Sequence, residues 1–73
     1  MPDQAEVITA QLIGVVRTWS SAEGECKPSV VCSLVVDISF VNYHQCADLL
    51  SRLLSQGKLK LEPYGRGLYI PEG

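Results

Sequence analysis

The chain has 73 residues, of which 47% are hydrophobic and 19% are charged, and its net charge is −2. This length allows one domain, residues 1–73, and the apolar content excludes disorder along the whole chain. Polar residues interrupt each apolar run before it reaches the ~18 residues of a membrane span. The acidic start differs from a signal peptide, so we expect no membrane as a partner.

Residues 2–21 are predicted to form a helix. Asp3 and Glu6 make a start that is similar to a capping box. Apolar residues then recur at helical spacing, namely Ile8, Leu12, Val15, Val16 and Trp19. A strand is the weaker alternative, because polar residues would then share a face with apolar ones. A loop with Gly and Pro follows at residues 22–28.

Residues 29–39 fit two patterns. Apolar and polar residues alternate from Leu34 to Phe40, as they do in a strand. A helix with Ser29 as its N-cap fits equally well, because one stripe at helical spacing contains Val30, Val31, Leu34, Val35 and Ile38. The β-propensity is high throughout, so periodicity alone does not decide between them.

Residues 42–56 carry the strongest helix signal. Asn42 is a suitable N-cap, and Gln45 at the third helical position completes a capping box. Gly57 supplies a left-handed stop. The apolar face consists of Cys46, Leu49, Leu50, Leu53 and Leu54.

Residues 58–71 are predicted to form a β-hairpin. The first arm alternates, with Leu59 and Leu61 on one face and Lys58 and Lys60 on the other. Residues 63–67 form a cluster of turn-forming residues, and an apolar return arm follows.

This order of elements is that of a winged helix-turn-helix. The end of the third helix and the wing of such regulators resemble two motifs of this chain, Leu50-x-x-Leu53-x-x-x-Gly57-x-Leu59 and Gly65-Arg66-Gly67-x-Tyr69. The resemblance covers about Ser29 to Pro71 and implies an α+β fold, a small winged helix with three helices plus a C-terminal β-hairpin. One departure is the turn from Ile38 to Asn42, which lacks the usual Gly and is predicted to be one residue long. The alternative fold makes both apolar segments strands, giving a single β-β-α-β-β sheet with one helix.

The resemblance implies that double-stranded DNA is the partner, met by the third helix and the wing. We expect the DNA-binding residues to be Tyr43, His44, Gln45, Arg52, Lys58, Lys60, Tyr64 and Arg66. A Gln side chain can make two hydrogen bonds to adenine, and a His side chain can contact guanine or a phosphate. An Arg side chain is attracted by the negative potential of a narrow minor groove. Asp48 argues against DNA, because a carboxylate repels phosphate, and an i,i+4 ion pair with Arg52 is its more ordinary role.

The three cysteines predict a reducing compartment. Small secreted domains carry an even and denser set, so we expect free thiols and a cytoplasmic protein. Cys26 and Cys32 lie farther apart than the two to four intervening residues typical of structural zinc sites. His44 and Cys46, two positions apart, would point in different directions on a helix. We therefore expect no metal and no cofactor.

The charges are segregated along the chain, because residues 1–26 carry a net −3 and residues 51–67 a net +3. Together with the resemblance to winged-helix regulators, the basic carboxyl half leads us to expect a small sequence-specific DNA-binding protein, a transcriptional regulator. It would act as a homodimer, because one helix and one wing make few phosphate contacts. The alternative is a non-catalytic protein-protein interaction or adaptor module, which the acidic balance and Asp48 favour. A chain with one His and little room for a pocket is not expected to be an enzyme.

Overall fold

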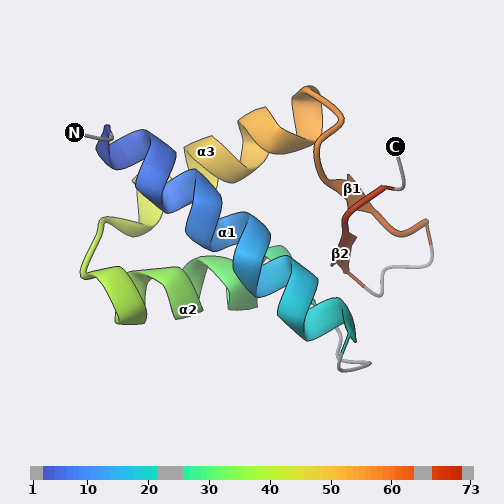
Figure 1. The fold of residues 1–73 in the computed structure, drawn as a ribbon, viewed down its shortest axis with the longest axis horizontal. Coiled ribbons are helices and arrows are strands. Elements are labelled where there is room, and N and C mark those ends of the chain that lie inside the picture. The colour runs from blue at the N-terminus through green and yellow to red at the C-terminus, as the bar shows by residue number, and fades with distance from the viewer. Residues whose placement is uncertain (1–2, 22–25, 64–66, 72–73) are drawn as a thin grey trace.

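Three helices precede a small β-hairpin in the computed structural model of the chain, which describes residues 3–21, 26–63 and 67–71 (Figure 1). The elements are α1 (Gln4–Ser21), α2 (Pro28–Ser39), α3 (Tyr43–Ser55), β1 (Lys60–Leu61) and β2 (Leu68–Tyr69). The two strands are antiparallel, with Lys60 opposite Tyr69 and Leu61 opposite Leu68. This confirms the predicted α+β arrangement of a small winged helix.

Helix α1 begins where its first residues predict. The Asp3 carboxylate accepts a hydrogen bond from the Ala5 N–H at 3.5 Å, and its carbonyl accepts one from the Val7 N–H at 3.1 Å. Both bonds satisfy N–H groups that lack a partner within the first turn of a helix. Further along, a fully buried stripe runs down one side of the helix and consists of Ile8, Leu12 and Val16.

Residues 29–39 are helical, so the strand interpretation and the β-β-α-β-β sheet are wrong. Pro28 occupies the first turn of α2, where its fixed φ suits a helix and its missing N–H is not needed. The buried residues of α2 are Val31, Cys32 and Val35, which lie on one helical face. This face packs against both α1 and α3. Burial on that face outweighs the β-propensity of the valines.

The turn between α2 and α3 spans residues 40–42, so the prediction of a single residue is also wrong. Phe40 ends α2 in the left-handed conformation, with φ 55° and ψ 38°, and its N–H donates to the Val36 carbonyl at 2.8 Å. Glycine is the usual residue in this conformation, because a Cβ brings a steric penalty. The Phe40 side chain is 93% exposed.

The hairpin is joined to the helices through its second strand. β2 packs against α1, and residue 26 forms a parallel bridge with Gly67. In this bridge the Leu68 N–H donates to the Cys26 carbonyl at 2.7 Å. β1 is the outer strand, which leaves Leu61 51% exposed although Leu59 and Leu68 are buried.

One cluster of buried side chains joins the three helices and the hairpin. Its members are Ile8, Leu12, Val16, Cys26, Val31, Cys32, Val35, Cys46, Leu49, Leu50, Leu53, Leu59 and Leu68. None of these side chains carries a charge at neutral pH, and the described residues include no buried polar or charged side chain. Within the described ranges, no helix is long and apolar enough to cross a membrane.

Candidate functional site

The first turn of α3 is held in place by Asn42. Its side-chain oxygen accepts a hydrogen bond from the His44 N–H at 2.8 Å, which confirms Asn42 as the N-cap. The bond goes to the second helical position rather than the third. Tyr43 and His44 are exposed, and Gln45 is half-buried. The turn therefore exposes two of the three predicted DNA-binding residues at the start of α3.

The outer face of α3 is polar and carries a negative charge. Opposite the buried stripe of this helix lie four exposed residues, His44, Asp48, Ser51 and Ser55. Their spacing of three or four residues places them on one side of the helix. Asp48, Ser51 and Ser55 have short side chains, so a ligand surface can approach this part of the helix closely. The carboxylate of Asp48 at the middle of this face repels phosphate groups, however.

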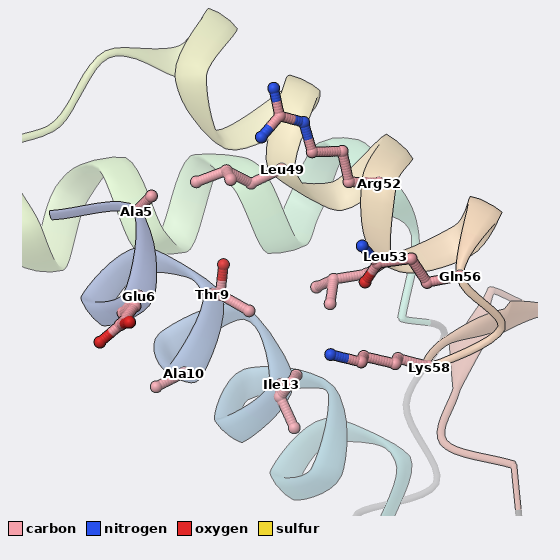
Figure 2. Close-up of a pocket in the computed structure, with 10 residues that line it drawn as sticks. All are labelled: Ala5, Glu6, Thr9, Ala10, Ile13, Leu49, Arg52, Leu53, Gln56 and Lys58. Atoms are coloured by element: carbon pink, nitrogen blue, oxygen red, sulfur yellow. The ribbon is translucent and has the colours of Figure 1, made fainter. Parts of the chain in front are cut away.

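Arg52 lies on the edge of α3 that faces α1, beside a groove between these two helices. This α1–α3 groove has a volume of about 440 Å³. It is lined by Ala5, Glu6, Thr9, Ala10, Ile13, Leu49, Arg52, Leu53, Gln56 and Lys58. Figure 2 shows the charged ends of Glu6 and Arg52 pointing away from the middle of the groove. The Lys58 ammonium points from the start of the hairpin toward α1 (Figure 2).

The position of Lys58 follows from how α3 ends. Gly57 has a φ of 76°, which confirms the predicted left-handed stop. The Gly57 N–H donates to the Leu54 carbonyl at 3.1 Å, and the Lys58 N–H donates to the Leu53 carbonyl at 3.0 Å. This pair of bonds is the Schellman motif. The motif turns the chain back over α3, so Lys58 lies at the groove and Lys60 on the hairpin.

The exposed face of the hairpin combines a lysine and a tyrosine. Lys60 and Tyr69 are directly paired across the two strands, and both are exposed. Paired residues of antiparallel strands have their side chains on the same face, so an ammonium and a phenol ring lie together here. Tyr69 is not among the site residues predicted from the sequence. Tyr69 belongs to the return arm of the predicted hairpin, opposite an arm that carries two lysines, and that was the available signal.

The three cysteines belong to the core. Cys26, Cys32 and Cys46 are buried and unpaired. Burial raises the pKa of each thiol, and the neighbouring Cys46 raises the pKa of Cys32 further. Among the described residues, no group of three or more His, Cys, Asp or Glu side chains is placed to hold a metal ion. These thiols act as small apolar side chains.

The predicted DNA-binding residues do not all share one surface. Tyr43 and His44 lie at the start of α3, Arg52 and Lys58 at the α1–α3 groove, and Lys60 on the hairpin. Two further predicted residues, Tyr64 and Arg66, lie outside the described residues. Comparison of the chain with protein-family models, with curated proteins and with solved structures finds no match.

Proposed function

We propose that the chain is a sequence-specific DNA-binding protein that acts in transcription regulation as a homodimer. The observation that carries the proposal is the winged-helix arrangement itself. It leaves the outer face of α3 unpacked, and the exposed hairpin that follows α3 carries Lys60 and Tyr69 on one surface. A helix of this kind enters a major groove, and the hairpin meets the adjacent backbone.

The charges on the hairpin favour binding to phosphate groups, whereas the carboxylate on α3 opposes it. Lys60 offers a phosphate contact, and the phenol of Tyr69 beside it can donate to a phosphate oxygen. On α3, His44 is the exposed residue best placed to meet a base edge. The Asp48 carboxylate opposes binding to a general duplex, and it is favourable only where it accepts from a cytosine amino group.

We also propose a non-catalytic role in the cytoplasm. The pKa of all three thiols is raised by burial, so none is poised as a thiolate nucleophile at neutral pH. Three unpaired cysteines in one small core suit a reducing compartment.

The proposal is tested by titrating a labelled DNA duplex of mixed sequence at low and at physiological salt. We expect binding that weakens steeply with salt, because neutralised phosphates release counterions. Lys60→Gln should weaken binding and lower the salt slope by about one. Arg17→Gln is the matched control, because it removes the same charge from α1 and should leave binding unchanged. Equal effects of the two substitutions, or no binding at low salt, would contradict the proposal.

Asp48→Asn tests whether α3 faces the DNA. The substitution preserves shape and removes the carboxylate from the middle of the outer face. If that face enters a groove, binding to a mixed-sequence duplex should become tighter, because a repulsion between Asp48 and phosphate is lost. Unchanged affinity would mean that α3 does not lie against the DNA.

A second candidate is a protein-interaction or adaptor module, which the α1–α3 groove favours. Leu49, Leu53 and Ile13 give the groove apolar walls, and the Lys58 ammonium points across it (Figure 2). Such a surface suits an amphipathic helix with acidic residues at its edge. The duplex titration separates the two functions, because the adaptor function predicts no DNA binding in the parent or in any variant.

A further inference from the structure

We infer that two copies of the chain pair by inserting Phe40 of each copy into a hollow between α1 and α2 of the other. The inference deepens the homodimer of the proposed function. It rests only on the proposal that the chain forms a homodimer, and this pairing does not require DNA. It arises from two features of the molecule that packing within a single copy does not explain.

The first feature is Phe40 itself. A large aromatic side chain that is 93% exposed leaves its ring in water. Its backbone also adopts the left-handed conformation, with φ 55°, which favours glycine. Non-glycine residues held in strained backbone conformations cluster at functional sites. Here the conformation projects an aromatic ring outward from the α2–α3 turn.

The second feature is the α1–α2 hollow, which has a volume of about 400 Å³. No ionisable side chain lines it, and its apolar walls include Val15, Trp19, Leu34 and Ile38. Gly14 lies in the wall that α1 provides, and a Cβ added there would meet nothing within 4 Å. Glycine within a helix lowers helix stability. Gly14 therefore makes α1 less stable than another residue would, and it keeps the hollow free of a side chain. Ile38 at the edge of the hollow is 61% exposed.

The chemistry of the hollow selects an apolar occupant. With no charged group in the lining, a phosphate backbone or a charged peptide would lose hydration without gaining an ionic partner. An aromatic ring that packs on such a surface removes a large apolar area from water. Aromatic side chains also contribute most of the binding free energy of many interfaces. Among the described large apolar side chains that are exposed, Phe40 is the most exposed. The chain therefore carries both the ring and the hollow that would receive it.

The two features lie close together on one side of the molecule. Phe40 follows Ile38 by two residues, and the Ser39 hydroxyl between them donates a hydrogen bond to the side-chain oxygen of Gln11, which lines the hollow. A two-fold axis near this point lets each Phe40 enter the other copy's hollow, so both contacts form in one closed dimer. The symmetric dimer then contains this contact twice. A substitution is present in both copies, so it removes both contacts.

Two substitutions test the inference from opposite sides of the contact. Phe40→Gly removes the ring and suits the left-handed turn, whereas Gly14→Leu fills the hollow from α1, where a Cβ meets nothing. We expect the parent to show a monomer–dimer equilibrium by sedimentation, without DNA. Each variant should raise the dissociation constant by at least about 100-fold, as loss of a central aromatic contact does. Leu61→Ala is the control, because it shortens an exposed apolar residue on the hairpin and should dimerise as the parent does.

Thermal melts distinguish this role from a purely structural one. At a dilution where the parent is monomeric, both variants should melt at or above the temperature of the parent, because they relieve a strained turn and raise helix propensity. A parent that stays monomeric at all concentrations overturns the inference. So does a dimer that either variant leaves intact. If the variants lose the dimer while the parent binds no duplex, the pairing surface stands and the DNA-binding proposal falls.

Discussion

Replacing Gly67 with alanine is expected to remove most of the stability of the domain. A Cβ at residue 67 would lie 2.5 Å from the carbonyl carbon and oxygen of Cys26 and 2.7 Å from its nitrogen. These neighbours are backbone atoms, so relief requires the two segments to separate. Separation loses the hydrogen bond from the Leu68 N–H to the Cys26 carbonyl, about 1 kcal/mol. It also exposes Leu68, about 1.5–3 kcal/mol.

Strain adds to this loss. Gly67 has a φ of 127°, and a residue with a side chain in such a region costs about 1–3 kcal/mol. The total of about 3.5–7 kcal/mol compares with roughly 4–11 kcal/mol for the unfolding of a domain of this size. Gly67→Ala should therefore be largely unfolded at room temperature or stable only marginally.

Two other glycines serve as controls, because a Cβ at either meets nothing within 4 Å. Gly57 has a φ of 76°, so Gly57→Ala should lose only the penalty for a left-handed residue, about 1–2 kcal/mol. Gly14 lies within α1, and Gly14→Ala should gain up to about 1 kcal/mol in helix propensity. The expected order of stability is Gly14→Ala, parent, Gly57→Ala, Gly67→Ala.

Urea unfolding followed by circular dichroism measures this order. The protein must be dilute enough to be monomeric, because association adds to apparent stability. If Gly67→Ala falls within about 1 kcal/mol of Gly57→Ala, where left-handed strain alone operates, the reasoning from the close approach of residues 26 and 67 is refuted.

Three further predictions concern the core, the cap and the thiols. Leu53→Ala should lower the free energy of unfolding by about 2–5 kcal/mol, because it leaves a cavity beneath α3; a loss near zero in a urea titration would place Leu53 outside the core. Asn42→Ala should cost about 1 kcal/mol through the lost cap, and an unchanged melting temperature would contradict this. Burial raises the pKa of the thiols of Cys26, Cys32 and Cys46 in the folded state. Their contribution to stability is therefore complete below the unfolded thiol pKa of about 8.5 and is lost as pH rises through the raised values. Urea unfolding at neutral pH and above pH ~9 should show this decline, and stability that rises over that range would contradict it.

The elements that sequence predicts well are those whose signals are local. Helix α3 has a cap at Asn42, an apolar stripe and a stop at Gly57, all within one short segment. Helix α2 has no comparable local signal, because its valines fit a strand as well as a helix. Its conformation is decided by packing of Val31 and Val35 between two other helices. Pro28 at the helix start was a local sign of the outcome.

The candidate site is predicted less completely, for a geometrical reason. Spacing along α3 identifies Arg52 as exposed, but only the placement of α1 shows that it lies beside a groove. The exposed pair of Lys60 and Tyr69 depends on the strand register. The left-handed conformation of Phe40 has no sequence signal, because the residue common at that position is glycine.

The bridge between Cys26 and Gly67 has a consequence for folding kinetics. The bridge joins segments that are separated by both α2 and α3. Closing that long loop is entropically unfavourable until the helices have come together. We therefore expect the bridge to form after the folding transition state, so that weakening it mainly accelerates unfolding. The hairpin then lengthens the lifetime of the native state while the folding rate stays that of a three-helix domain.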